Sequence, residues 1–463
     1  MEPRPLHYIA QATAGELRHG SPEVMVSRLC TDSRRAGAGD LFFALSGEHF
    51  DAHSVLREVA KSGVGAIVAE RGKLPADFRA CPVIAVDNTR RALGLLAACY
   101  RRDYHLPIVA VGGSNGKTTT KELIASVLRQ ARVTLWSEAS FNNEIGVPLS
   151  LLRLERAHEA AVLEAGTNHP GELAPLLKMI APSHGVITNI GREHLEFFHD
   201  LDGVAREEGT IGEALPSSGV LFVNGDDPRS LSLARRAVAK VRRVGMAEGN
   251  DYRAVNVHCH ENGAVFLARC PNAGLDGEYR IQLLGRHQVA NALFALAVGA
   301  ELGLDRAAIE SGLAACRPEK MRLQLHDLAG LRVLDDAYNA NADSMLAALD
   351  TLREFPCPGR RVAVLGDMAE LGESSAPAHA EVGRRAAELG LDHLFAVGSR
   401  ASEIAASARH GGLRNTVEIL DVDRAAQAVK DLARPGDVVL VKASRSMRLE
   451  RVIAALRQER KEP

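Results

Sequence analysis

From residue 107 onward, hydrophobic residues gather in short, nearly continuous runs separated by stretches of helical periodicity. The first helical stretch, 118–130, follows directly after the apolar run that ends at Val111. Strands that are apolar on both faces and alternate with helices indicate a parallel sheet covered by helices on both sides. Four runs predict the strands of this sheet: 107–111, 160–166, 185–190 and 219–227.

A second series of such runs begins after Pro318 and predicts another α/β unit. Before residue 105 the pattern is shorter and more mixed, with the runs DLFFAL, GAIVAE and PVIAVDN. A chain of 463 residues exceeds what one hydrophobic core usually supports. We therefore expect an α/β protein of three domains, 1–104, 105–317 and 318–463, with strands of the third at 331–341, 360–372, 392–399 and 436–446.

The segment AVNVHCHENGAVFLA consists of two alternating runs joined by Asn262 and Gly263, a residue pair typical of a tight hairpin turn. His258 and His260 would share one face of the first strand, with no third metal ligand nearby in the sequence. This segment therefore predicts a hairpin and no metal site.

Composition narrows the class of protein. Hydrophobic residues make up 46% and charged residues 25%, as in ordinary soluble proteins, and the formal net charge of -2 does not favour nucleic acid as a partner. Without an apolar stretch of about 18 residues, or an apolar run of a signal peptide at the start, we expect no membrane insertion. Seven scattered cysteines without a C-x-x-C pair favour a cytoplasmic protein with reduced thiols.

Polar side chains follow each predicted strand of the middle domain. In open α/β sheets, ligands bind outside the carboxyl ends of the strands, so these residues favour a common site. They are a glycine-rich loop after Val111, Glu164 after the second strand, Asn189 and His194 after the third, and Asn224, Asp226 and Asp227 after the fourth.

The glycine-rich loop, in VAVGGSNGKTTTKE (109–122), resembles a phosphate-binding loop but has Val111 where the standard pattern has its first glycine. Glycines let backbone N–H groups approach phosphate oxygens, and the helix that follows presents its positive end to the same anion. Lys117 supplies a charge, while Thr118 and Glu164 supply oxygen ligands suited to Mg²⁺. The alternative is a glycine-rich turn followed by a solvated lysine.

Motifs in all three predicted domains resemble the Mur ligases. In the first domain the motif is TDSRRAGAGDLFFALSGEHFDAH (31–53). The middle domain carries GGSNGKTTTKE, FNNEIGVPLSLL, LEAGTNHPGE, NIGREHLE and LLGRHQVANALFALA. The third carries DDAYNANADSM, LGDMAELG and LVKASRSMRLE.

This resemblance implies a UDP-binding N-terminal domain, a central P-loop-like ATPase domain and a C-terminal Rossmann-like domain. DDAYNAN with GDMAELG is similar to the family member that adds D-alanyl-D-alanine to UDP-N-acetylmuramoyl-tripeptide. The implied cofactors are ATP and Mg²⁺, and the implied chemistry is activation of a peptide carboxylate as an acyl phosphate. We expect a monomer whose domains close on the substrates; the third residue of the tripeptide stays open.

The resemblance also implies roles for single residues. His287 and Asn291 lie four apart on one helix face, and the Asn amide suits an adenine edge. Catalytic roles fall to Lys117, Glu164 and His194, and magnesium binding to Thr118, Glu164, His194 and Glu208. The implied ATP contacts are Gly112, Gly113, Ser114, Asn115, Gly116, Lys117, Thr118, Thr119, Asn142, His287, Asn291, Arg322, Asp336 and Asn339.

Two further groups are implied to bind the substrates. Asp32, Ser33, Arg34 and Ser46 would bind the uridine diphosphate. Lys442, Ser444 and Arg445 follow a strand of the third domain, and Arg suits a carboxylate such as the terminus of the amino substrate. Without the resemblance, TDSR reads as a turn and the third-domain residues as a solvated strand end.

The sequence departs from the family pattern at several positions. Ala443 stands where glycine is usual, Ala342 where proline is usual, and Met321 where glycine often precedes Arg322. In GVAREEGTI the family usually carries a lysine that becomes a carbamate and helps to hold Mg²⁺, whereas this chain has Glu208. Glutamate is also an anionic ligand with two oxygens, but Glu207 and Glu208 could equally be solvated residues of a helix surface.

Two other functions are compatible with parts of these patterns. One is a related ligase that adds amino acids to a different acid, such as folylpolyglutamate synthase; the N-terminal motif argues against it. The other is a non-catalytic, ATP-gated binding protein that kept the fold.

Overall fold

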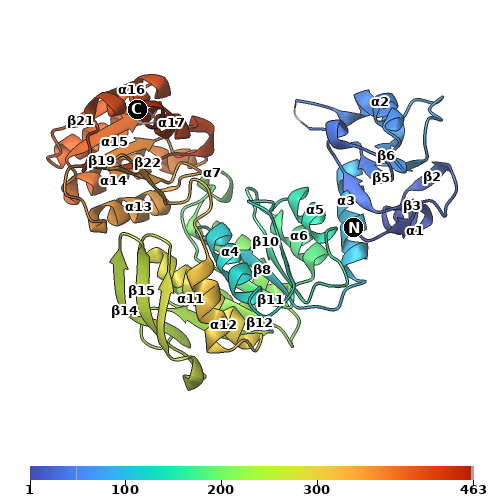
Figure 1. The fold of residues 1–463 in the computed structure, drawn as a ribbon, viewed down its shortest axis with the longest axis horizontal. Coiled ribbons are helices and arrows are strands. Elements are labelled where there is room, and N and C mark those ends of the chain that lie inside the picture. Colours follow the sequence, from blue (N-terminus) through green and yellow to red (C-terminus); the bar gives the residue numbers. More distant parts are fainter. Residues whose placement is uncertain (48, 460–463) are drawn as a thin grey trace.

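A computed structural model of the chain describes residues 1–47 and 49–459. Glu48, within the N-terminal motif, and residues 460–463, at the end of the predicted third domain, lie outside the described residues. Three large sheets follow one another along the described part of the chain, and the N-terminal and C-terminal ones stand on opposite sides of the central one (Figure 1). The α/β fold with mostly parallel sheets confirms the expected fold class. No helix in the described part of the chain is long and apolar enough to cross a membrane.

The N-terminal sheet has the strand order β2-β7-β6-β5-β4. Its strands β4 to β7 are parallel, while β2 pairs antiparallel with β7, which agrees with the mixed pattern of this region. The elements are β2 (Glu16–His19), β4 (Arg28–Cys30), β5 (Asp40–Phe43), β6 (Ala66–Glu70), β7 (Val83–Val86), α1 (Leu6–Ala12), α2 (Leu56–Lys61), α3 (Thr89–Arg101) and a small antiparallel pair, β1 (Arg4–Pro5) and β3 (Met25–Val26).

The central sheet has the order β16-β15-β14-β13-β12-β11-β8-β10-β9. The strands from β9 through β14 are parallel, and β14, β15 and β16 form antiparallel pairs that include the predicted hairpin. The strands are β8 (Ile108–Gly112), β9 (Thr134–Trp136), β10 (Ala160–Glu164), β11 (His184–Ile187), β12 (Val220–Asn224), β13 (Lys240–Gly245), β14 (Tyr252–His260), β15 (Gly263–Arg269) and β16 (Gly277–Ile281).

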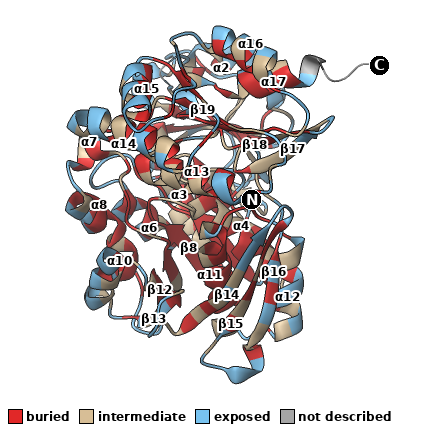
Figure 2. Cartoon of the chain, turned by 90° about the vertical axis from the view of Figure 1, so that its left-hand side faces the viewer, coloured by how far each residue is buried: buried red, intermediate tan, exposed pale blue. Residues whose placement is uncertain are grey.

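Helices cover both faces of this sheet because its strands are apolar on both sides. Val109 and Val111 pack into the same core as α4 and α11, whereas Ile108 and Ala110 face the core shared with α5 and α6. Figure 2 shows β8 and β12 almost wholly buried. The helices are α4 (Lys117–Leu128), α5 (Gly146–Leu151), α6 (Leu173–Ile180), α7 (Leu195–Phe198), α8 (Leu201–Glu208), α9 (Thr210–Glu213), α10 (Pro228–Leu233), α11 (His287–Glu301) and α12 (Arg306–Ala315).

The C-terminal sheet has the order β17-β18-β22-β19-β20-β21, parallel except for β17. Helices again lie on both faces, around two separate apolar cores. The elements are β17 (Gln324–Leu328), β18 (Leu331–Asp335), β19 (Arg361–Gly366), β20 (His393–Val397), β21 (Thr416–Ile419), β22 (Val438–Lys442), α13 (Ala342–Glu354), α14 (Ser375–Glu388), α15 (Ala401–His410), α16 (Val422–Leu432) and α17 (Glu450–Glu459).

Helix α3 connects the N-terminal unit to the central unit by packing against both. The Tyr100 hydroxyl donates to the Leu154 carbonyl at 2.6 Å, and Arg101 Nε donates to the Ile180 carbonyl at 3.0 Å. Its apolar side chains belong to a core that also contains residues of α1, α5 and α6. The transition near residue 104 is therefore a shared helix rather than a free linker.

Candidate functional site

The strands β12, β11, β8 and β10 are neighbours in the central sheet and run parallel, so the polar residues after them meet at one edge. A cavity of about 1090 Å³ opens there, lined also by residues of the C-terminal unit. Asn224 and Asp227 line it, whereas Asp226 does not: its carboxylate accepts from the backbone N–H groups of Met246 and Ala247. Among the predicted site residues, those lining the cavity are Ser114, Asn115, Gly116, Lys117, Thr118, Thr119, Asn142, Glu164, His194, His287, Asn291, Arg322, Asp336, Asn339, Lys442, Ser444 and Arg445.

The glycine-rich loop runs from the end of β8 to the start of α4. Gly113 and Gly116 have φ values of +107° and +81°, which residues with a side chain rarely adopt. A Cβ on Gly113 would also lie 2.3 Å from Thr188 Oγ1. Helix α4 begins at Lys117, so its N-terminal N–H groups lie beside the loop. This strand–loop–helix arrangement is suited to an anion.

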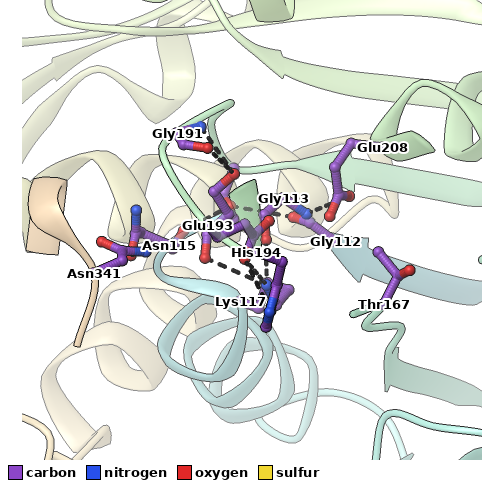
Figure 3. Close-up of polar contacts among 12 residues, drawn as sticks. Gly112, Gly113, Asn115, Lys117, Thr167, Gly191, Glu193, His194, Glu208 and Asn341 are labelled. Atoms are coloured by element: carbon purple, nitrogen blue, oxygen red, sulfur yellow. Dashed lines mark hydrogen bonds and ion pairs between the residues drawn. The ribbon is translucent and has the colours of Figure 1, made fainter. Parts of the chain in front are cut away.

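The Lys117 ammonium lies against the loop and contacts a buried carboxylate (Figure 3). Its Nζ donates to the Gly113 carbonyl at 2.5 Å and to Glu193 Oε2 at 3.1 Å. Burial alone would lower the pKa of Lys117, but the carboxylates of Glu193, Glu208 and Glu164 outweigh it and raise the pKa. Lys117 is therefore a cation held at the loop.

Glu164 ends strand β10 and is 1% exposed. Its Oε1 accepts from Asn142 Nδ2 at 2.8 Å, while its Oε2 is buried with no hydrogen-bond partner among the described residues. Lys121, a fully buried lysine, stabilises the loop that leads to Asn142. Its Nζ donates to the carbonyls of Ser137 and Ala139 in that loop. An unpartnered buried carboxylate oxygen is costly and indicates a missing cation or donor.

The two glutamates of α8 are buried, contrary to the alternative that both are solvated. Glu207 accepts from the N–H groups of Gly171 and Leu173, both at 2.8 Å, and so fixes the loop after β10. Glu208, 1% exposed, accepts the Gly113 N–H at 2.6 Å with Oε2, while its Oε1 has no partner among the described residues (Figure 3). Burial raises the pKa of Glu208 to about 8, although Lys117 acts in the opposite direction.

The C-terminal unit contributes side chains that contact the loop directly. Arg322 Nη2 donates to Thr118 Oγ1 at 3.2 Å, and its guanidinium lies 4.1 Å from the centre of the Tyr338 ring. Asn341 Nδ2 donates to Asn115 Oδ1 at 2.9 Å. His194 Nδ1 contacts the Glu370 carboxylate, also from this unit. The cavity is thus shared between two sheets.

An ion-pair group links the same two units beside the cavity. Arg192 Nη2 lies 2.7 Å from Asp343 Oδ1 at the start of α13, and its Nη1 lies 2.5 Å from Glu381 Oε2 on α14. A planar guanidinium can bind two carboxylates in fixed directions, which suits it to orienting one unit against the other.

His287 is the first residue of helix α11 and Asn291 lies one turn further along it; both line the cavity. Asn291 is 6% exposed; its Oδ1 accepts from Thr120 Oγ1 at 3.1 Å and its Nδ2 donates to Gln288 Oε1 at 2.8 Å. In this structure its amide therefore supports α4, and adenine recognition stays a prediction. Burial lowers the pKa of His287 to about 4, so the imidazole is neutral at pH 7.

The residues predicted to bind the amino substrate make contacts within the C-terminal unit. Lys442 Nζ donates to Asp336 Oδ2 at 2.6 Å and to the Asn339 carbonyl at 3.0 Å, and Ser444 Oγ accepts the Ala369 N–H. Arg445 is more exposed and pairs with Glu450 at 3.1 Å. Of these three side chains, that of Arg445 is the most accessible to a substrate carboxylate.

The predicted uridine-diphosphate residues lie on the N-terminal unit, outside the cavity. Asp32 caps a short turn beginning at Ser33 and accepts from the Arg34 guanidinium at 2.8 Å. Ser46 Oγ accepts from Lys73 Nζ at 2.7 Å. Gly112, Gly113 and Glu208 also do not line the cavity; Glu208 lies behind the loop, where it accepts the Gly113 N–H.

The departures from the family pattern have local structural consequences. Met321 has a φ of +59°, so a methionine adopts the left-handed conformation for which glycine is better suited. Ala342 is the first residue of α13 after the cap Asn341, a position where proline is also favourable. Ala443 is fully buried opposite Gly366, whose missing side chain leaves room for the alanine methyl.

No role was predicted from the sequence for Glu193, Lys121 or Glu370, and Glu207 was expected only as a neighbour of Glu208 that could be solvated. Glu193 directly precedes His194, so its position next to a predicted ligand was an available signal. Lys121 has no such signal, because a lysine on a helix is usually solvated.

The chain matches known proteins over almost its whole length. Residues 111–299 match the Mur ligase middle domain, and residues 321–445 match the Mur ligase glutamate ligase domain. The UDP-N-acetylmuramoyl-tripeptide–D-alanyl-D-alanine ligase of Escherichia coli (strain K12) is 37% identical over 451 residues, which cover 96% of each chain.

Solved structures of MurF ligases are also similar to this chain over most of its length. A crystal structure of MurF from Acinetobacter baumannii has a TM-score of 0.90 and 33% identity and covers 99% of both chains. MurF ligase from Thermotoga maritima in complex with ADP has a TM-score of 0.82 and 27% identity, covering 93% of this chain and 97% of that one. With both family domains matched and identity above 30% over nearly all of the chain, this protein belongs to the Mur ligase family.

Proposed function

We propose that this chain is an ATP-dependent amide ligase that joins D-alanyl-D-alanine to UDP-N-acetylmuramoyl-tripeptide, giving the pentapeptide precursor of peptidoglycan. The observation that carries the proposal is the near-full-length similarity to a ligase of that name. A phosphate-binding loop that faces a cavity shared with the C-terminal unit supports it, because such a cavity can bring ATP and two further substrates together.

In the proposed reaction, the tripeptide carboxylate attacks the γ-phosphate of ATP and releases ADP. The amine of D-alanyl-D-alanine then attacks the acyl phosphate, the amide bond forms and phosphate leaves. The first step brings an anion to a polyanion, so its transition state needs positive charge and precise positioning. Lys117 and the N–H groups at the start of α4 supply these at the loop.

Magnesium fits the residues that surround the loop. Two buried carboxylate oxygens, Glu164 Oε2 and Glu208 Oε1, have no hydrogen-bond partner among the described residues, and both belong to side chains expected as ligands. The described residues contain no group of three acidic, His or Cys side chains able to hold an ion by themselves. Thr118, Glu164, His194 and Glu208 would therefore hold Mg²⁺ together with phosphate oxygens and water, and the ion would neutralise phosphate charge.

The remaining assignments follow from the same proposal. Residues 1–104 would hold the uridine diphosphate through Asp32, Ser33, Arg34 and Ser46, residues 105–317 would bind ATP, and residues 318–463 would bind the amino substrate, with Arg445 on its carboxylate. We propose a monomer in the cytoplasm, where ATP is available and the seven cysteines, all free in this structure, stay reduced.

A coupled ADP-release assay tests the function. With UDP-N-acetylmuramoyl-tripeptide present, we expect ADP release that depends on D-alanyl-D-alanine and that single amino acids do not support. Tripeptides with diaminopimelate or lysine as the third residue should be compared, since the sequence does not distinguish them. ADP release that depends on a single amino acid would instead favour a different ligase. If no ADP is released with any acid, a non-catalytic binding protein is favoured.

The acyl-phosphate intermediate predicts the fate of one oxygen atom. With ¹⁸O in the reacting tripeptide carboxylate, one labelled atom should appear in the released phosphate, because the acyl C–O bond breaks in the second step. Mass spectrometry of the phosphate measures this transfer. Amide product formed with unlabelled phosphate would rule the intermediate out.

A further inference from the structure

The Lys117 ammonium has no donor left for an additional acceptor in this structure. An ammonium carries three N–H donors. Nζ donates to the Gly113 carbonyl at 2.5 Å, to the Ser114 carbonyl at 3.3 Å and to Glu193 Oε2 at 3.1 Å. A phosphate bound at the loop must therefore take the place of one of these acceptors.

Glu193 is the acceptor that a phosphate would displace. The two carbonyls belong to the loop itself, whereas Glu193 comes from the segment between β11 and α7, 76 residues further along the chain. It is 6% exposed and lines the same cavity. Because it alone among the three carries a full negative charge, an incoming phosphate repels it most strongly.

The charges around the lysine make this competition strong. Glu164, Glu193 and Glu208 all act on Lys117, and Glu193 also repels the charged form of Glu208. Glu164 and Glu208 each have a buried oxygen without a partner among the described residues, whereas Glu193 has Lys117. Glu193 therefore differs from the two expected metal ligands: its partner is the cation that the nucleotide needs.

We propose that Glu193 is a positioning residue that competes with the nucleotide phosphates for Lys117. This inference rests on the proposed ATP site. Glu193 holds the ammonium charged and against the loop, yields it to the phosphates when nucleotide binds, and takes it back when ADP leaves. It thereby lowers nucleotide affinity and speeds product release.

The test is ADP binding by calorimetry, with and without Mg²⁺, to the full chain and to Glu193→Gln. Glutamine keeps the shape but removes the charge, so we expect ADP to bind roughly tenfold more tightly and to dissociate more slowly. Damage to the fold would weaken binding, so a gain in affinity separates competition from a structural role. Glu193→Ala should show the same direction, and Glu196→Gln, an exposed carboxylate on α7, should leave ADP affinity unchanged.

A double-mutant cycle shows whether the effect acts through the lysine. In the Lys117→Ala background, Glu193→Gln should increase ADP affinity much less than in the wild type, because no ammonium is released. A gain of equal size in both backgrounds, or no gain in the wild type, would overturn the proposal. A wild-type chain that does not bind ADP at all would contradict the ATP site itself.

Discussion

Lys117→Ala should abolish ligase turnover, with a loss on the order of 10³-fold or more. Nζ is the cation that the structure holds at the loop, within 2.5 Å of the Gly113 carbonyl, and alanine leaves the phosphates without it. The measurement is steady-state ADP release at saturating tripeptide and D-alanyl-D-alanine. We expect the loss mainly in kcat, because the charge that Lys117 would stabilise develops in the transition state.

The control must separate lost chemistry from lost folding, because Lys117→Ala also leaves Glu193 buried without its partner. Thermal unfolding of the variant should be compared with that of Lys117→Ala/Glu193→Gln, which removes the unpaired charge. Lys178→Ala, an exposed lysine on α6, is the matched surface substitution and should keep full activity. Near-normal ADP release by a folded Lys117→Ala chain would place the ATP site elsewhere.

Glu208→Gln should lower turnover by roughly 10²-fold at limiting Mg²⁺. A glutamine oxygen can still accept the Gly113 N–H, which Glu208 Oε2 accepts at 2.6 Å, so the loop should stay in place. Glutamine cannot supply the anionic oxygen that Mg²⁺ would bind at Oε1, the oxygen without a described partner. Activity should therefore recover in part as Mg²⁺ is raised, which a titration of ADP release against Mg²⁺ measures.

Glu208 has no amine and cannot form a carbamate, so activity should not depend on bicarbonate. The carboxylate arm is shorter than a carbamylated lysine, and α8 lies close enough for Oε2 to reach the loop directly. Glu207→Gln is the matched control: it weakens the loop that Glu207 fixes and should lower stability without changing the Mg²⁺ requirement. If Glu208→Gln equals the wild type at limiting Mg²⁺, Glu208 is not a ligand.

The apolar strands and the glycine-rich loop between a strand and a helix could be predicted from the sequence because their signals are local. The run PIVAV before the glycines specifies a strand buried on both faces, and β8 is found at Ile108–Gly112. Strands with mixed composition, such as β13 (KVRRVG) and β21 (TVEI), were not predicted. β13 carries cationic side chains and β21 lies at the edge of its sheet, so neither forms a continuous apolar run.

The hydrogen-bond partners of the polar side chains in the site could not be predicted from the sequence, because the tertiary structure decides them. Lys117 meets Glu193 across 76 residues, the Gly113 N–H meets Glu208 across 95, and Asn115 meets Asn341 across 226. A carboxylate has nearly the same local sequence preferences whether it is solvated or buried, so no periodicity distinguishes Glu208 from a surface residue. Its burial follows from the packing of α8 against the loop, because only the folded chain brings these distant segments within hydrogen-bonding distance.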